Sequence, residues 1–388
     1  MRVCLISLDF PPFRSSGLTI YAENVVRQLA LREHAVTVIA AERPASMQAD
    51  HVSIAGDVRV VRVPIGRADW IGLGWQVARY LHAERSEFDV VHFADVHFAY
   101  AYSGRYVASA WQSFRQRLHS HHGQPYHTSR RNYLFRVSYY SAARWLLEKR
   151  SVRRAHHVVM PSRATQAEFV QHYGLDPART TLIYPGLELQ RFRVLPPRDE
   201  ARRRLGLPAD TPVVLYVGFS TPRKGVEYLA EAMATLAPST RLVMAGCWEA
   251  GYQERFLAAL GQARTRTLVL GYVPDCEMPF CYAAADVLVL PSLLEGLGIP
   301  PIEAMAAGLP VVVSAGGASE EVVAGAGLTV PAGDSASLAS ALAQVLGDRD
   351  LRARLGQLGR RRAYELFDPQ QAASKLEAVY RAAAEGKP

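Results

Sequence analysis

The stretch from Pro291 to Val313, PSLLEGLGIPPIEAMAAGLPVVV, decides the fold of the second half of the chain. An apolar run, DVLVLP, leads into this stretch and is typical of a buried β-strand. The glycines Gly296 and Gly298 predict a tight loop, and Pro300 and Pro301 lie where the first turn of a helix tolerates proline. The stretch therefore predicts a strand, a glycine-rich loop and a helix in succession.

The loop and the helix after it carry groups that suit an anionic polyol. Free backbone amides at a helix start, together with the positive end of the helix dipole, favour a phosphate, and glycine lets that phosphate approach the backbone. Glu295 lies in the loop and Glu303 in the first turns of the helix, so each carboxylate can accept hydrogen bonds from a vicinal diol. The pattern indicates a site for a sugar attached to a nucleotide. The alternative is a buried turn whose glutamates only cap the helix.

The spacing of these residues, E-x7-E inside P-S-x-x-E-G-x-G-x-P-x-x-E-A-M-A-x-G-x-P-V-V, resembles that of the retaining glycosyltransferases of family 4 (glycosyl transferases group 1), which have the GT-B fold. Before residue 155 the resemblance is limited to the first strand and its glycine turn, REHAVTVIA and DVVHF. After residue 155 it extends, in the family's order, over VVMPSRATQAEFVQHYG, YPGLELQRF, VGFSTPRKGVEYLAEAM, LVLGYVPDCEMPFCYAAADVLVLPS and GGASEEVV.

The resemblance implies a role for each residue of the donor site. Glu303 would hold the nucleotide ribose, Glu295 would contact the donor sugar, and Lys224 would neutralise the diphosphate, so Glu295 and Lys224 are the expected catalytic residues. The nucleobase would lie near Tyr272 and Val273. The expected donor-binding residues are Gly17, Gly218, Arg223, Lys224, Glu295, Gly296, Leu297, Gly298, Ile299 and Glu303.

The chain departs from the family pattern in two of its phosphate loops. Where many members have an arginine directly after the glycine, Phe219 follows Gly218, and we expect Arg223 to substitute in part for the missing cation. The loop after the first strand often has two glycines in the family, whereas here Gly17 follows Ser16.

The acceptor is expected on the N-terminal domain. Many family members carry a histidine near the reacting sugar, but the corresponding segment here offers Trp111 and Gln112. Asp95 and His97 fall just past a predicted strand end and are candidates to orient an acceptor hydroxyl. His92, inside that strand, is interpreted as a hydrogen-bonded core histidine.

The chain reads as two α/β domains. Its 388 residues are about half apolar, enough for two cores, and strands alternate with helical patterns in both halves, as in parallel sheets covered on both faces. We predict two Rossmann-like, doubly wound domains facing a cleft, over residues 1–195 and 196–369, with a C-terminal helix at 370–388 that packs back on the first domain. The expected strands are VCLIS, AVTVIA, VRVVRVP, DVVHF, YVASA and HHVVMP, then PVVLYVG, RLVMAG, TLVLG, VLVLP and PVVVSA.

Several classes of protein do not fit the composition. No apolar run approaches the roughly 20 residues of a membrane span, and MRVCLISLDFPP reads as a strand, so a cytoplasmic protein is expected. Four scattered cysteines without CxxC spacing argue against a metal cage or a disulfide framework. The D-x-D triplet at Asp348 reads as a capped helix start, and we expect no metal cofactor.

The net charge of +8 is unevenly distributed. The segment between Gly104 and Arg163 contains many basic residues, interleaved with aromatic ones, and a single acidic residue, Glu148. This basic region, 105–163, could contact an anionic acceptor or the inner membrane surface, or it could be a solvated loop with an amphipathic helix. Nucleic acid is not an expected partner, because no known nucleic-acid motif accompanies the charge.

The sequence thus predicts a metal-independent retaining hexosyltransferase of the EC 2.4 class. Its donor would be a nucleoside-diphosphate sugar, UDP- or GDP-linked, and its acceptor a hydroxyl of a glycan, a lipid-linked molecule or a small molecule. Two alternatives remain: a nucleotide-sugar epimerase or hydrolase on the same fold, and a nucleotide-sugar-binding protein that has lost turnover.

Overall fold

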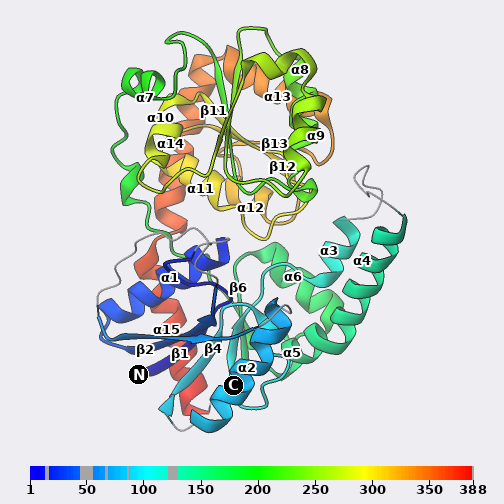
Figure 1. The fold of residues 1–388 in the computed structure, drawn as a ribbon. Coiled ribbons are helices and arrows are strands. Elements are labelled where there is room, and N and C mark those ends of the chain that lie inside the picture. The colour runs from blue at the N-terminus through cyan, green and yellow to red at the C-terminus, as the bar shows by residue number, and fades with distance from the viewer. Residues whose placement is uncertain (14–16, 44–55, 66–68, 85–86, 121–129, 387–388) are drawn as a thin grey trace. The chain divides into compact units, whose positions relative to one another are not determined.

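The computed structural model describes residues 1–13, 17–43, 56–65, 69–84, 87–120 and 130–386. The chain forms two compact units (Figure 1). Unit 1 comprises Met1–Glu188 and Phe367–Pro388, and unit 2 comprises Leu189–Leu366. The chain therefore leaves unit 1, builds unit 2 and returns.

Unit 1 contains a seven-stranded parallel sheet in the order β3-β2-β1-β4-β5-β6-β7. Strand β1 is an inner strand, in which Cys4 pairs with Thr37 of β2 and with Val91 of β4. The strands are β1 Arg2–Ile6, β2 Ala35–Ala41, β3 Val58–Val63, β4 Val90–Phe93, β5 Val107–Ser109, β6 His157–Met160 and β7 Thr180–Leu182.

Both faces of this sheet are buried, which explains why its central strands are continuous apolar runs. Cys4 and Ile6 face a core shared with α2 and α6, whereas Val3 and Leu5 face a second core shared with α1 and α15. The helical segments of unit 1 are α1 Gly17–Leu31, α2 Asp69–Glu84, η2 Val96–Ala99, α3 Phe114–Ser120, α4 Arg130–Ala143, η3 Arg144–Glu148, α5 Lys149–Arg154, α6 Arg163–Tyr173, η4 Pro177–Arg179 and α15 Pro369–Glu385.

The last helix, α15, packs on unit 1 beside α1. Its buried residues Leu376, Val379 and Tyr380 join the core that also contains Val3 and Leu5 of β1. The Tyr380 hydroxyl lies 2.6 Å from Nδ1 of His92. The C-terminal segment is thus part of the first core, although the whole of unit 2 separates it from that core in the sequence.

Unit 2 contains a six-stranded parallel sheet in the order β10-β9-β8-β11-β12-β13. Its strands are β8 Val213–Val217, β9 Arg241–Ala245, β10 Thr267–Gly271, β11 Val287–Leu290, β12 Val311–Ala315 and β13 Leu328–Pro331. Its helical segments are η5 Gln190–Phe192, α7 Arg198–Arg204, η6 Pro222–Lys224, α8 Val226–Thr235, α9 Tyr252–Ala259, η7 Gly261–Arg266, α10 Met278–Ala284, α11 Ile299–Ala306, α12 Ser319–Val323, α13 Ser335–Gly347 and α14 Arg349–Leu366.

The two doubly wound α/β sheets confirm the predicted fold class, and every strand expected from the sequence is present. The structure adds β7 and β13, one at an edge of each sheet. The chain passes between the units after Glu188 and after Leu366, so residues 189–195, which the sequence assigned to the first domain, belong to unit 2.

Replacing Leu376 by alanine should destabilise unit 1. Leu376 is 3% exposed, and a cavity at a buried leucine costs about 2 to 5 kcal/mol. Hydrogen exchange of the β1 amides, followed by mass spectrometry, should show faster opening in Leu376→Ala. Exposed Lys375 on the same helix provides the control, Lys375→Ala. Equal protection of β1 in both variants would show that α15 does not support this core.

Candidate active site

The expected donor residues of unit 2 gather where its strand order reverses. Strands β9 and β10 lie on one side of β8, and β11, β12 and β13 lie on the other. In open parallel sheets, ligands bind beyond the carboxyl ends of the strands at such a switch point. Lys224 follows β8 and Glu295 follows β11, so the two loops that flank the reversal supply one charge each.

Lys224 and Glu295 form a buried ion pair. The Lys224 ammonium contacts Oε1 of Glu295; Glu295 is buried and the Lys224 side chain is mostly buried. The Ser292 hydroxyl donates to the same oxygen at 2.7 Å, and the Arg223 guanidinium lies 3.8 Å from it. Within the described part of the chain, all hydrogen bonds and ion pairs of this carboxylate go to Oε1. Its second oxygen, Oε2, is therefore available for a ligand hydroxyl.

The cations beside Glu295 keep it ionised. Burial alone would raise the pKa of this carboxyl, but Lys224 and Arg223 lower it, and the net pKa lies below its usual value. Arg223 also donates to the Leu294 carbonyl oxygen at 2.5 Å. The carboxylate is thus charged and held in place before any ligand arrives.

Two glycines allow the backbones around Glu295 to approach closely. Gly225 follows Lys224 at φ 62°, and a Cβ there would lie 2.2 Å from the Pro291 carbonyl oxygen. Gly317 has φ 71°, and its Cβ would lie 2.0 Å from the Glu295 carbonyl oxygen. The loops after β8, β11 and β12 are therefore packed backbone against backbone, which fixes the position of the carboxylate.

Glu303 lies on α11 and is also buried. Arg191 donates to its Oε1 at 2.7 Å, and the Tyr282 hydroxyl donates to its Oε2 at 2.8 Å. Burial raises the pKa of Glu303 above its usual value, although Arg191 and Tyr282 oppose the rise. Each carboxylate oxygen can accept a second hydrogen bond, so the ribose contact expected at Glu303 remains chemically available.

Arg191 is a site residue that the sequence analysis missed. Its guanidinium bridges Glu303 and Asp275, the latter at 2.9 Å. Asp275 is the last residue of the GYVPD segment, near which the nucleobase was expected. Arg191 thus joins the loop after β10 to the start of α11. The signal lay in the quoted segment YPGLELQRF, but an arginine near a predicted domain boundary gave no reason to pair it with Glu303.

The other expected donor residues of unit 2 line the same sheet edge. Gly218 follows β8 with φ 149°, and Phe219 after it is half-exposed. Tyr272 is also exposed, and Val273 is partly buried after β10. Gly296, Leu297 and Gly298 lead into α11, which begins at Ile299, and Gly298 lies in the left-handed region at φ 88°.

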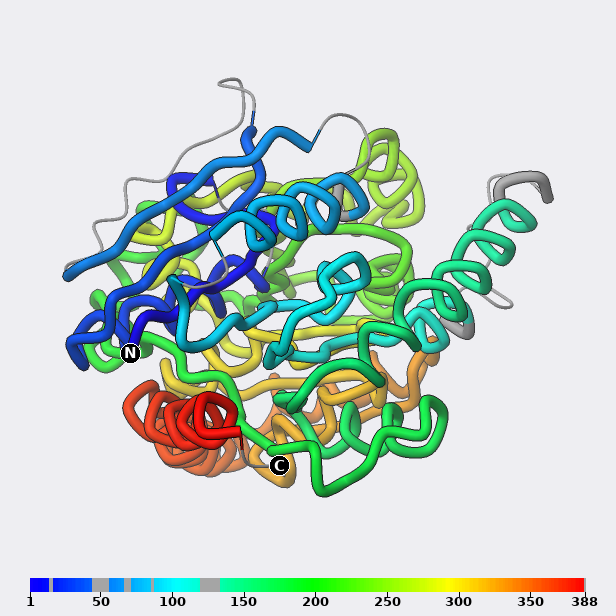
Figure 2. Tube along the Cα trace, turned by 90° about the horizontal axis from the view of Figure 1, so that it is seen from below, coloured from blue at the N-terminus to red at the C-terminus, as the bar shows by residue number. Residues whose placement is uncertain are grey.

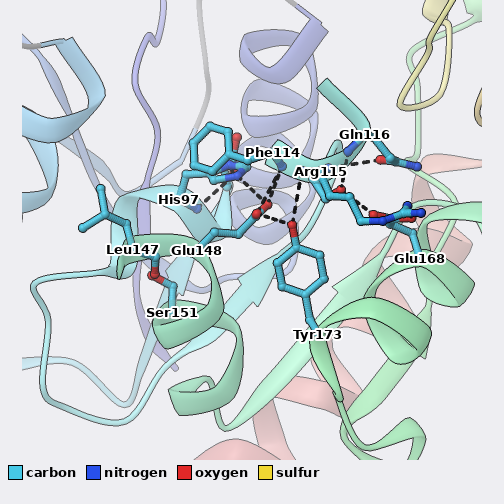
Figure 3. A network of polar contacts seen from close by, with 11 residues as sticks. His97, Phe114, Arg115, Gln116, Leu147, Glu148, Ser151, Glu168 and Tyr173 are labelled. Carbon is cyan, nitrogen blue, oxygen red and sulfur yellow. Dashed lines mark hydrogen bonds and ion pairs between the residues drawn. The ribbon is translucent and has the colours of Figure 1, made fainter. Parts of the chain in front are cut away.

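In unit 1, the candidate acceptor residues are engaged with each other. Asp95 caps the short helix η2, accepting from the His97 amide at 3.1 Å, and its carboxylate lies 2.6 Å from His97 Nδ1. His97 Nε2 lies 2.9 Å from the fully buried Glu148 (Figure 3). Burial alone would lower the pKa of His97, but the two carboxylates raise it to about 9. His97 is therefore a charged, buried link between η2 and Glu148.

The remaining residues singled out in unit 1 lie at the start of α1 and around the ends of β4 and β5. Gly17 is exposed and begins α1, and Ser16 lies outside the described residues. Trp111 donates from its ring to the Ala94 carbonyl oxygen at 2.8 Å. His92 lies between Tyr380 and the Ser109 hydroxyl, at 2.6 and 3.0 Å, and burial lowers its pKa to about 3. The interpretation of His92 as a satisfied core histidine is confirmed.

The described residues contain no group of three or more His, Cys, Asp or Glu side chains that could hold a metal ion. Asp348 accepts from the Leu351 amide at 2.9 Å, which confirms that the D-x-D triplet caps a helix. Within the same residues, no helix combines the length and the apolar content that crossing a bilayer requires.

Replacing Lys224 by methionine should destabilise unit 2 in a pH-dependent way. The folded pKa of Glu295 is below its unfolded value, so the ion pair contributes stability above the unfolded pKa and loses it as the pH falls through the folded pKa. In Lys224→Met only Arg223 and Ser292 still oppose the effect of burial, so we expect the folded pKa of Glu295 to rise. The ionised carboxylate then destabilises the fold at neutral pH, and this destabilisation decreases as the carboxylate is protonated. The expected loss is about 3 to 5 kcal/mol at neutral pH.

Urea unfolding of Lys224→Met at pH 7 and at pH 5 measures this effect, and Lys375→Met on the exposed face of α15 is the control. The loss should be larger at pH 7. An equal loss at both pH values would contradict the ion-pair account.

Comparisons with known proteins agree with this geometry. The family model described as "Glycosyl transferases group 1" matches residues 197–362, and the model "Glycosyltransferase Family 4" matches residues 15–191. A D-inositol 3-phosphate glycosyltransferase of Kineococcus radiotolerans is 30% identical over 100% of this chain and 96% of its own. An uncharacterized glycosyltransferase of Methanocaldococcus jannaschii is 27% identical, with 99% of both chains covered.

Solved structures share the architecture. Sucrose-phosphate synthase from Thermosynechococcus elongatus superposes with a TM-score of 0.82 at 24% identity, over 100% of both chains. The Anabaena protein HepE, in complex with UDP and glucose, has a TM-score of 0.73 at 20% identity and covers 98% of this chain and 100% of its own. Given a charged site at the switch point of unit 2 and relatives that match along the entire length, this chain belongs to the group 1 glycosyltransferases, is an enzyme of the EC 2.4 class and has the GT-B fold.

Proposed function

We propose that this glycosyltransferase moves a hexose from a nucleoside-diphosphate sugar, UDP- or GDP-linked, to a hydroxyl acceptor, with retention of the anomeric configuration and without a metal ion. The observation that carries the proposal is the Glu295 carboxylate. Its Oε1 binds Lys224 and Ser292, while its Oε2 is left for a sugar hydroxyl. A charged, immobile acceptor of hydrogen bonds at a switch point is suited to orienting a hexose.

The diphosphate would be bound by the cations that already surround Glu295. An ammonium has three donors, so Lys224 can keep its contact with Glu295 and still donate to a phosphate oxygen. Arg223 is partly exposed and lies on the same loop, where it would supply the second positive charge. This arrangement would compensate for Phe219, which stands where many relatives have an arginine. These charges stabilise the leaving nucleotide as the glycosidic bond breaks.

The nucleoside would lie over the loop after β10 and the start of α11. Glu303 would accept hydrogen bonds from the ribose diol, with Arg191 and Tyr282 holding the carboxylate in position. Tyr272 and Val273 would border the base. The HepE structure, described as a complex with UDP and glucose, supports a donor of this class.

The reaction follows a front-face displacement. The bond between the anomeric carbon and the phosphate oxygen breaks as the acceptor oxygen bonds to the same face of that carbon. The acceptor proton passes to the departing phosphate oxygen. The protein then supplies position and charge rather than a covalent intermediate, and Lys224 supplies charge compensation that a metal ion would otherwise provide.

The acceptor would bind unit 1. Asp95 and His97, which follow the end of β4, remain candidates to orient the acceptor hydroxyl. In this structure both are buried and hydrogen-bonded to each other. The similarity to D-inositol 3-phosphate glycosyltransferases favours a phosphorylated polyol among the acceptors to be tried first. Gly17, at the start of α1, is the candidate donor contact from this unit.

Product analysis tests the proposal. The enzyme is incubated with UDP- and GDP-hexoses and a panel of polyol, phosphorylated polyol and glycolipid acceptors, with and without excess EDTA. Proton NMR coupling constants should show that the product keeps the donor's anomeric configuration. The rate of product formation should be the same with and without EDTA.

An inverted product would contradict retention, and loss of turnover in EDTA would contradict metal independence. Donor consumption without acceptor would indicate an epimerase or hydrolase, and tight donor binding without any product would indicate a binding protein.

A further inference from the structure

One exposed helix face in unit 1 combines apolar and basic side chains. The segments α4, η3 and α5 follow each other without a break, so residues 130–154 form one long helix with a π-helical turn. In Figure 2 the α4 end of this helix extends away from the sheet of unit 1. Its large exposed apolar residues are Leu134, Phe135, Trp145 and Leu146, which are 54%, 69%, 60% and 69% exposed.

These four residues lie on one side of the helix. Leu134 and Trp145 are separated by 11 positions, as are Phe135 and Leu146, and that interval is about three helical turns. The opposite side faces the protein, since Ala143, Glu148 and Val152 are buried. The exposed side therefore carries two apolar pairs, with the exposed Ser138 and Ala142 between them, and no other described part of the chain covers these pairs.

Basic side chains follow the second apolar pair toward the C-terminal end of the helix. Arg150, Arg153 and Arg154 are exposed, and the Lys149 ammonium lies 4.0 Å from the centre of the Trp145 ring. We call the face formed by Leu134, Phe135, Trp145, Leu146, Lys149, Arg150, Arg153 and Arg154 the basic apolar face.

The one acidic residue of the basic region does not reduce this charge at the surface. Glu148 is completely buried and points away from solvent. It accepts from the Phe114 amide at 3.0 Å and from the Tyr173 hydroxyl, and it pairs with His97 at 2.9 Å (Figure 3). Glu148 is the only acidic residue of region 105–163, and it is buried. The described side chains that this region exposes to solvent therefore carry no negative charge.

The same contacts hold the helix firmly on unit 1. The Tyr106 hydroxyl donates to the Ser151 carbonyl oxygen at 2.6 Å, whereas the bond from the Ser151 hydroxyl to the Leu147 carbonyl oxygen, at 2.9 Å, lies within the helix. Through Glu148 and His97 the helix is also joined to η2, directly after β4. The basic apolar face is thus presented on a rigid support beside the strand end at which an acceptor is expected.

We propose that the basic apolar face binds the surface of an anionic lipid bilayer. Leucine, phenylalanine and tryptophan side chains of an interfacial helix enter the boundary between headgroups and acyl chains, while arginine and lysine remain among anionic headgroups. This membrane docking goes beyond the proposed glycosyl transfer and does not depend on it. A bilayer fits better than a nucleic acid, because the exposed leucines and the phenylalanine of this face gain nothing from a phosphate backbone.

Vesicle binding of the full-length protein tests this proposal. The protein is sedimented with vesicles of phosphatidylcholine alone and with vesicles containing phosphatidylglycerol, at low and high salt. It should bind the anionic vesicles, more weakly at high salt, and not the neutral ones. Tryptophan emission should shift to shorter wavelength on binding, as the Trp145 ring leaves water.

Matched variants separate the face from general surface properties. Trp145→Ala should abolish the emission shift, whereas Trp75→Ala, which removes a tryptophan that is 66% exposed on α2, should retain it. Arg150→Glu should weaken vesicle binding about fivefold or more, because a cation near an anionic surface contributes about 1 kcal/mol. Arg203→Glu, which makes the same charge change at an exposed site on α7, should have a much smaller effect.

Three results would overturn the proposal. The first is no binding of the wild type to anionic vesicles. The second is that Trp145→Ala binds as well as wild type and keeps the emission shift, and the third is that Arg150→Glu and Arg203→Glu weaken vesicle binding equally. A short DNA duplex serves as a soluble polyanion. If it bound the protein through Arg150 while the anionic vesicles did not, the face would be a nucleic-acid surface instead. Donor turnover, measured in parallel with a soluble acceptor, should be unchanged in all four variants.

Discussion

The buried ion pair between Lys224 and Glu295 is the interaction on which the donor site depends. It joins the loops that leave the sheet of unit 2 on either side of its strand reversal. Removing two charges from water costs free energy that their attraction repays only in good geometry, so such a pair is a poor way to gain stability. The same ion pair is well suited to keeping a carboxylate ionised and fixed in position. Gly225 and Gly317 allow the backbone contacts that give the pair this geometry.

A second buried carboxylate has a comparable role in unit 1. Glu148 holds a long helix against the strand ends through His97, Phe114 and Tyr173, and its burial leaves the surface of that helix cationic. The buried Glu148 thus both anchors the helix and leaves the exposed surface of the helix positively charged. Unit 1 also depends on the return of the chain, because Tyr380 from α15 contacts His92 in the centre of its sheet.

Much of this architecture could be predicted from the sequence, and the exceptions have physical reasons. Central parallel strands are continuous apolar runs, whereas the edge strands β7 and β13, TTL and LTVP, are short and partly exposed and resemble turns. Glu295 and Glu303 were identified because they belong to a spaced motif, and Lys224 because its segment resembles that of a known family. Arg191 was missed because its partners, Asp275 and Glu303, are distant in sequence, and only the folded chain brings them together.

The most direct test of the account is a calorimetric titration of wild type and Glu303→Ala with the nucleotide sugar that the wild type binds, with Glu200→Ala on the exposed surface of α7 as the control. Loss of a charged hydrogen-bond acceptor for the ribose diol should weaken binding about tenfold or more, since 1.4 kcal/mol corresponds to a factor of ten. Glu200→Ala should bind like the wild type. An unchanged affinity in Glu303→Ala would contradict the assignment of the donor site to Glu295 and Glu303.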